Sequence, residues 1–310
     1  MTVTVDNAAA FLRRRFNEDI GAPAPVGQGE WSRAYYFRHA AQDYVIRFSP
    51  LSEDFEKDVV AAGYSSTDLP VPPIVELGEA FDGFYAISER LPGDYLDDAD
   101  ERKMRDLLPS IFAALDAMRL TDISATRGYG IWTADENAPH ATGRDYLLDV
   151  VNDRPTDRVH GWRERLALSP TGIGPFQEAV GCFQALVDQV PEDRHLVHSD
   201  LLHFNVLVSG RRITAVIDWG DSKYGDFLYD VAWFTFWAPW YRAWDGIDFK
   251  REALQHFESI GLSVPHFDER LQCCGLHIGL SGQAYCAFAG HWDDLEWTAR
   301  RTLAVARGPN

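Results

Sequence analysis

One segment constrains the fold of this chain more than any other. Residues 195–205 read HLVHSDLLHFN, and residues 213–220 read ITAVIDWG. Between them lie a β-rich run and a Ser-Gly turn, a combination typical of a β-hairpin. The hairpin returns the chain to the end from which it started. We therefore expect Asp200, Asn205 and Asp218 to lie near one another.

Two carboxylates and one amide at a common centre are the side chains that phosphoryl transfer needs. We assign Asp200 to orient and deprotonate the attacking hydroxyl, and Asn205 and Asp218 to hold Mg²⁺ against nucleotide phosphates. An isolated H-x-D triplet would carry little weight in a chain this rich in aspartate, but the whole string is far harder to obtain by chance. We expect His198 to be a packed, hydrogen-bonded histidine that supports the loop.

These residues resemble the aminoglycoside phosphotransferases, a family with a protein-kinase-like fold, and within it the enzymes that phosphorylate hygromycin B. The matching segments are 29–34, 195–200, 212–219, 224–226, 236–240 and 291–294. The resemblance implies an antibiotic-resistance enzyme that transfers the γ-phosphate of ATP or GTP to a hydroxyl of hygromycin B or a related aminoglycoside. The alternatives are a kinase of the same fold for a macrolide, choline-like amine, homoserine-like metabolite or fructosamine, and a nucleotide-binding pseudokinase.

The net charge bears on the partners. The 310 residues carry a formal charge of −18, which argues against nucleic acid or an anionic membrane as a partner. The charge suits a cationic acceptor such as an aminoglycoside, although acidic surfaces also serve solubility alone. The four cysteines have no zinc-site or disulfide spacing, and the N-terminus has no secretory signal pattern. We therefore expect a cytoplasmic protein.

The hydrophobic pattern predicts an α+β fold. We expect residues 1–90 to form a small nucleotide-binding lobe with an antiparallel sheet, and residues 91–310 to form a larger, mainly helical lobe with the catalytic loop and acceptor site. The nucleotide is expected in the cleft between the lobes. Strands are predicted near 34–37, 44–48, 74–77 and 84–88, and helices near 8–17, 55–64, 101–119, 144–151, 175–190, 229–243, 250–260 and 268–288.

A glycine-bearing turn is the first candidate for binding the nucleotide. Gly27, Gly29 and Ser32 fall between the first predicted helix and the first strand, and glycine lets backbone N–H groups approach phosphate oxygens closely. The resemblance also implies that the linker containing Glu89 and Leu91 meets the purine through backbone groups. Backbone recognition leaves the choice between ATP and GTP open.

Arg47 is the candidate for steadying the phosphates. It ends the run YVIR at residues 44–47, where kinases place a lysine. Arginine binds phosphate through a planar, bidentate fork, so the role survives the change. The alternative is an ordinary surface strand residue. Its ion-pair partner is expected on the next helix, as either Glu56 or Asp58.

The acceptor side is predicted from the segment that follows the hairpin. The resemblance implies that Asp230 braces the catalytic loop through backbone hydrogen bonds. Trp237 and Trp240 suit stacking on sugar rings and attraction of ammonium groups, although aromatics at helical spacing also fill cores. Asp221 is a further candidate for contact with substrate amines. Other acidic candidates are Asp293, Asp294 and Glu296, and each of these four residues is individually more typical of a solvated surface.

The chain departs from the family pattern beside the metal-binding asparagine. Phe204 precedes Asn205, where the hygromycin-type pattern has a second asparagine, and His203 comes before it. This change bears on the identity of the acceptor. It leaves the transfer chemistry untouched.

Overall fold

The computed structural model describes residues 3–16, 20–28 and 32–308. The chain forms two compact units. The first unit contains Met1–Asp98, Thr133–Glu136 and Phe204–Asp221, and the second contains Ala99–Trp132, Asn137–His203 and Ser222–Asn310.

These units differ from the predicted lobes because the hairpin belongs to the first unit. The hairpin strands β9 (Val206–Ser209) and β10 (Arg212–Val216) form a three-stranded sheet with β6 (Asp94–Tyr95), in the order β10-β9-β6. The backbone N–H of Val216 also donates to the carbonyl of Pro70 at 2.8 Å. The pairing of β9 with β6 joins strands more than a hundred residues apart, so no local sequence pattern predicts it. The functional assignment of lobes 1–90 and 91–310 stays a prediction.

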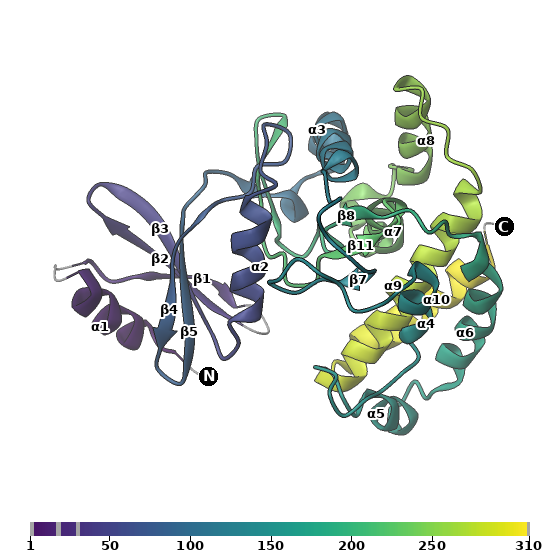
Figure 1. Cartoon of the computed structure of the whole chain (residues 1–310), viewed down its shortest axis with the longest axis horizontal. Helices are drawn as coiled ribbons and strands as arrows, with labels where there is room; N and C mark the ends of the chain where they lie inside the picture. Colours follow the sequence, from purple (N-terminus) through teal and green to yellow (C-terminus); the bar gives the residue numbers. More distant parts are fainter. Residues whose placement is uncertain (1–2, 17–19, 29–31, 309–310) are drawn as a thin grey trace. The chain divides into compact units, whose positions relative to one another are not determined.

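A five-stranded antiparallel sheet dominates the first unit. Its strands are β1 (Ala24–Gln28), β2 (Arg33–His39), β3 (Gln42–Ser49), β4 (Ile74–Ala80) and β5 (Gly83–Glu89), in the order β1-β2-β3-β5-β4. Helix α1 (Val5–Phe16) packs on the sheet, where Leu12 joins Phe37, Phe48 and Ile87 in one core (Figure 1). Truncating a buried leucine of this kind costs about 2–5 kcal/mol, so α1 is an integral part of the unit.

Helix α2 (Glu53–Ala62) has an unusual buried face. Phe55 and Ala61 are buried as an amphipathic helix requires, but Lys57 and Asp58 are buried with them. Lysine and aspartate are almost never fully buried unless they are paired. The partners of these two residues therefore decide what α2 does in the first unit.

The second unit is mainly helical. Its α-helices are α3 (Glu101–Leu120), α4 (Gly143–Asp149), α5 (Trp162–Leu168), α6 (Gly174–Leu186), α7 (Leu228–Trp237), α8 (Phe249–Ser259), α9 (Phe267–Ala289) and α10 (Trp292–Ala306). A small sheet in the order β7-β11-β8 joins β7 (Gly130–Ile131), β11 (Lys223–Gly225) and β8 (His195–Val197). The predicted α+β class, an antiparallel N-terminal sheet followed by a mainly helical part, is confirmed.

Helix α9 is the centre of the second unit, and α10 runs against it (Figure 1). The close approach requires Gly279, because a Cβ added there would lie 2.2 Å from Oγ1 of Thr302. Helices α5 and α10 were not predicted. The buried face of α10, Leu295, Thr298, Ala299 and Thr302, has helical spacing but two hydroxyl residues, which weaken its hydrophobic pattern. Among the described residues, no helix combines the length and apolarity needed to cross a membrane.

Candidate active site

The loop that carries Asp200 is held by one buried carboxylate of the second unit. The backbone N–H groups of His198 and Ser199 donate to the two carboxylate oxygens of Asp230 at 2.9 and 2.7 Å. Asp230 lies in the first turn of α7 and is 2% exposed. Burial raises the pKa of Asp230 to about 6, although the two amide hydrogen bonds oppose the shift. The bracing role predicted for Asp230 thus has a direct geometric basis.

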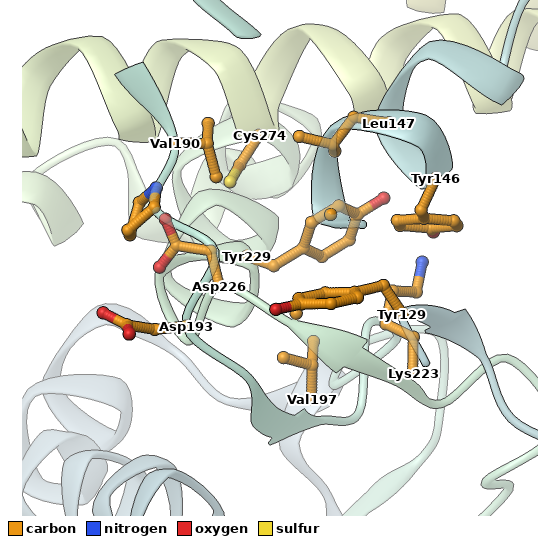
Figure 2. A pocket seen from close by; sticks show the side chains of 13 residues that line it. Tyr129, Tyr146, Leu147, Val190, Asp193, Val197, Lys223, Asp226, Tyr229 and Cys274 are labelled. Atoms are coloured by element: carbon orange, nitrogen blue, oxygen red, sulfur yellow. The ribbon is translucent and has the colours of Figure 1, made fainter. Parts of the chain in front are cut away.

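Lys223 supports this carboxylate and was missed in the sequence. Its charge lowers the pKa of Asp230, against the effect of burial. The Lys223 side chain is buried, with Nζ 4.2 Å from the ring centroid of Tyr229 and 5.6 Å from that of Tyr146 (Figure 2). Lys223 begins β11, which pairs with β8 directly before the Asp200 loop. The adjoining cavity of about 20 Å³ has room for little more than one water molecule, so it is no substrate pocket.

Asp200 itself is accessible and has two histidine neighbours. Its side chain is 26% exposed, and Oδ1 lies 2.8 Å from Nδ1 of His203. The backbone N–H of Asp200 donates to Nδ1 of the buried His198 at 3.2 Å, which fits the structural role predicted for that histidine. Ser199 and His203 have φ angles of 66° and 57°, in the left-handed region that non-glycine residues seldom adopt. Strain of this kind is concentrated at functional sites.

Asn205 and Asp218 lie together at one end of the hairpin in the first unit. Val206 pairs with Val216, and the backbone N–H of Ile217 donates to the carbonyl of Asn205 at 2.9 Å. The hairpin prediction is therefore confirmed. Asp218 is exposed and has a φ of 63°.

Asp200 belongs to the second unit, and its convergence with Asn205 and Asp218 stays a prediction. An amide oxygen and a carboxylate fit the preference of Mg²⁺ for oxygen ligands, with substrate phosphates completing its coordination. No cluster of three or more His, Cys, Asp or Glu side chains suited to a metal occurs in the described part of the chain. The metal-binding roles of Asn205 and Asp218 stay a prediction.

A cavity of about 110 Å³ in the first unit has the character of a nucleotide pocket. Apolar side chains from the sheet and the hairpin line it, together with the charged residues Arg47 and Asp218. The predicted linker residues Glu89 and Leu91 also line it. Of the glycine turn, Gly27 falls in β1 and Ser32 directly precedes β2, whereas Gly29 lies outside the described residues.

The ion-pair partner of Arg47 is Asp58, one of the two alternatives left open by the sequence. Nη2 of Arg47 pairs with Oδ2 of Asp58, and the side chains are only 18% and 6% exposed. Burial lowers the pKa of Arg47, but the charges of Asp58 and Asp218 outweigh burial and the net shift is upward. The other oxygen of Asp58 accepts the backbone N–H of Trp219 at 3.0 Å. Asp58 thereby connects Arg47 to the loop that carries Asp218.

An aromatic cluster lies beside the Asp200 loop in the second unit. Trp237 stacks on Trp297 with ring centroids 5.4 Å apart, and Trp240, which is 45% exposed, contacts Trp297 edge-on at 4.9 Å. The ring of His203 lies 5.1 Å from that of Trp237 and 5.9 Å from that of Trp233.

The sequence pointed to only two members of this cluster. Trp233 precedes Trp237 by four residues on the same helix, a spacing that could have identified it. Trp297 was missed because α10 was missed. The indole N–H groups of Trp233 and Trp237 are buried and meet no acceptor among the described residues, a rare condition that recurs at functional sites.

The predicted acidic contacts are exposed residues of both units. Asp221 is exposed and belongs to the first unit. Asp293 and Asp294 are exposed in the first turn of α10, and Glu296 forms an exposed pair with Arg300 at 3.4 Å. Exposed pairs of this kind contribute little to stability, and a role of these acidic residues in binding substrate amines stays a prediction.

Comparison with known proteins identifies the family of this chain. The profile of the phosphotransferase enzyme family (APH) matches residues 24–265. The hygromycin-B 4-O-kinase of Escherichia coli is 30% identical over 307 residues, covering 98% of this chain and 86% of that protein.

Solved structures of aminoglycoside phosphotransferases are similar to this chain over nearly its whole length. The crystal structure of aminoglycoside phosphotransferase APH(4)-Ia has a TM-score of 0.86 and 29% identity, covering 99% of this chain and 100% of that one. A thermostable variant of that enzyme, in ternary complex with AMP-PNP and hygromycin B, has a TM-score of 0.83 and 28% identity, covering 96% and 97%. The predicted protein-kinase-like fold is therefore confirmed, and this chain belongs to the phosphotransferase enzyme family.

Proposed function

We propose that this protein is an aminoglycoside O-phosphotransferase that transfers the γ-phosphate of ATP or GTP to a hydroxyl of hygromycin B or a related aminoglycoside. The observation that carries the phosphoryl-transfer part is the cavity of the first unit, where Arg47 and Asp218 lie beside an apolar surface. The acceptor is supported by the similarity to the hygromycin-B 4-O-kinase. Expression of the gene is then expected to protect bacteria from hygromycin B.

On the donor side, the purine occupies the apolar part of the cavity and contacts backbone groups between Glu89 and Leu91. Arg47 binds the phosphates, and Asp58 fixes the direction of its guanidinium. Asn205 and Asp218 would hold Mg²⁺. A metal bound there would supply positive charge to neutralise the phosphates during transfer.

On the acceptor side, Asp200 accepts the proton of the attacking hydroxyl. Asp230 and the strained loop keep Asp200 in position, so that little reorganisation is needed at the moment of transfer. Trp237 and Trp240 provide aromatic faces for the sugar rings and for the ammonium groups. The net charge of −18 favours the approach of a polycationic acceptor.

Phe204 favours a second candidate, in which the same chemistry acts on a different acceptor. Its side chain is 55% exposed, and its backbone N–H donates to Oδ2 of Asp97 at 3.0 Å. A large exposed aromatic side chain next to Asn205 replaces a polar group of the family pattern. An acceptor that offers an apolar or sugar face at this point would gain contact from it.

The test is an acceptor panel with the purified protein. Hygromycin B, other aminoglycosides, a macrolide, choline and fructosamine are each incubated with Mg²⁺ and ATP or GTP, and the products are examined by mass spectrometry for one added phosphoryl group. Addition to hygromycin B supports the proposal. Addition only to a neutral macrolide would show that the acceptor is a macrolide and not an aminoglycoside. Tight nucleotide binding without transfer to any acceptor would indicate a pseudokinase.

The free cysteines support a cytoplasmic location. All four are free of disulfide bonds, and burial raises the pKa of Cys286 to about 12, which disfavours the reactive thiolate. Cell fractionation of a strain that expresses the tagged protein tests this assignment. Recovery in the periplasmic or membrane fraction would contradict it.

A further inference from the structure

Lys57 is a buried, charged residue of the first unit whose position the proposed roles leave unexplained. It lies on α2 and is 1% exposed, although lysine is normally among the most exposed residues. Its Nζ donates to the backbone carbonyl of Gly220 at 2.6 Å, across 163 positions of sequence. The ammonium group is therefore directed at the loop that follows the hairpin.

Helix α2 holds this loop at two successive residues. Asp58 accepts the N–H of Trp219 at 3.0 Å, and Lys57 donates to the carbonyl of Gly220. A third residue of the same helical face, Asp54, borders the loop. A Cβ added at Gly220 would lie 3.1 Å from Oδ1 of Asp54. Positions i, i+3 and i+4 of one helix thus face a single short segment.

The segment needs such support because it is strained. Asp218 has a φ of 63°, a conformation that costs a non-glycine residue energy and persists only when its surroundings enforce it. A hydrogen bond from a charged donor is stronger than one between neutral groups. The contact from Lys57 lies two residues from Asp218 and restrains the backbone of the loop that carries it.

We propose that Lys57 is a positioning residue that holds residues 218–220 so that Asp218 is ready to bind the metal–nucleotide complex. The inference deepens the proposed function and rests on the metal-binding role given there to Asp218. Lys57 acts through the loop backbone and touches no reacting atom. The opposing expectation is electrostatic, because a buried cation near a metal site would repel the metal and weaken its binding.

The two expectations predict opposite changes in Mg²⁺-supported nucleotide affinity when the ammonium group of Lys57 is removed, and calorimetry can measure this change. AMP-PNP is titrated into the wild-type protein and into Lys57→Met with and without Mg²⁺. Methionine keeps the aliphatic stem and removes the ammonium group. Loss of positioning is expected to weaken the binding of AMP-PNP in the presence of Mg²⁺ by about tenfold, which is the lower end of the effects seen when residues that support a metal ligand are replaced. Binding of AMP-PNP without Mg²⁺ is expected to stay unchanged. Tighter Mg²⁺-supported binding in Lys57→Met would overturn the inference.

Two further variants guard against a purely structural effect. Lys57→Arg keeps a cationic donor and is expected to restore most of the Mg²⁺ effect, and it serves as the test if Lys57→Met does not fold. Lys103→Met, on α3 of the second unit, is the control for removing a lysine and is expected to behave as wild type. Equal weakening with and without Mg²⁺ in Lys57→Met would mean that Lys57 only maintains the fold, and the inference would be wrong.

A double-mutant cycle with Asp218→Asn tests whether Lys57 acts through Asp218. If it does, Lys57→Met adds no further loss of Mg²⁺-supported binding once Asp218 is replaced. Additive losses would contradict the inference. If Mg²⁺ does not strengthen nucleotide binding in the wild type, the proposed function itself fails. If the wild type responds to Mg²⁺ and Lys57→Met responds equally, only the role of Lys57 is refuted.

Discussion

The backbone N–H of Ser199 donates a 2.7 Å hydrogen bond to Oδ1 of Asp230. Ser199 directly precedes Asp200 and has a φ of 66°. A left-handed conformation costs an L-residue about 1–2 kcal/mol, so the loop needs a compensating interaction. Asp230 provides it from a buried position on α7. The geometry of the proposed catalytic loop is thus determined by a carboxylate thirty residues further along the chain.

Replacing Asp230 by asparagine is expected to lower kcat more than it raises KM. Asparagine has one carbonyl oxygen to accept an N–H, and its NH₂ group would face the second donor. The loop would loosen while the substrate-binding surfaces remain. Steady-state kinetics with circular dichroism as a control for folding checks this expectation. A kcat equal to that of the wild type would show that Asp230 does not position Asp200.

The pKa of Asp230, raised to about 6 by burial, gives the stability a definite pH dependence. The folded state binds this proton more tightly than the unfolded state does. This residue therefore makes the free energy of unfolding fall as pH rises from about 4 to about 6, by roughly 3 kcal/mol in total. Urea denaturation of wild type and Asp230→Asn across this range measures the difference. An identical pH dependence in the two proteins would contradict the assignment.

Asp200→Ala is expected to reduce turnover by about 10²–10⁴-fold, the usual contribution of a positioned general base. Nucleotide binding is expected to stay intact, because Arg47, Asn205 and Asp218 remain. A coupled assay measures turnover, and calorimetry with AMP-PNP measures binding. Equal loss of both would argue against these roles.

The buried pair of Arg47 and Asp58 predicts an asymmetry between two variants. Arg47→Ala leaves Asp58 buried without its charged partner, so stability is expected to fall by about 3–5 kcal/mol and the nucleotide KM to rise. Asp58→Asn keeps an oxygen that can accept the N–H of Trp219, so the hairpin loop is better preserved. Thermal unfolding and nucleotide KM values check both variants. A greater rise of KM in Asp58→Asn than in Arg47→Ala would refute the phosphate-binding role of Arg47.

Trp240→Ala is expected to raise the KM for the acceptor about tenfold while leaving the nucleotide KM unchanged. The exposed face of Trp240 contributes stacking and cation–π attraction, each worth about 0.5–2 kcal/mol. Trp292→Ala is a matched control, since Trp292 is 40% exposed but starts the neighbouring helix α10. A similar effect of both substitutions would show that Trp240 has no specific role.

Gly279→Ala tests the packing of α9 against α10. The added Cβ would lie 2.2 Å from Oγ1 of Thr302, so the Thr302 side chain or one of the two helices must shift. Overpacking of this kind costs about 1–3 kcal/mol. Chemical denaturation measures the loss. A second substitution, Thr302→Ala, is expected to recover part of it, and a full loss in the double variant would mean that the clash lies elsewhere.

The sequence by itself determined the hairpin and the residues around it. Asn205 and Asp218 lie at one end of the hairpin because a two-residue turn pairs two adjacent strands, which is a local property; the register shift between Ile213 and Ala215 was not predicted. Helix α3 was predicted almost to the residue, since its apolar periodicity and its capping residue Asp100 are also local signals. The helix α10 was missed because hydroxyl residues occupy half of its buried face.

Only the tertiary structure decided which partner each charged residue has. The sequence left Glu56 and Asp58 equal, because both lie on α2 and only packing selects the residue that faces Arg47. Nothing in the sequence indicated that Lys57 and Lys223 are buried, since a lysine is expected at the surface unless the groups that surround it are known. Burial and charge pairing are properties of residues brought together from distant parts of the chain. A linear sequence records which side chains are available, and the folded chain determines which of them are desolvated and therefore paired.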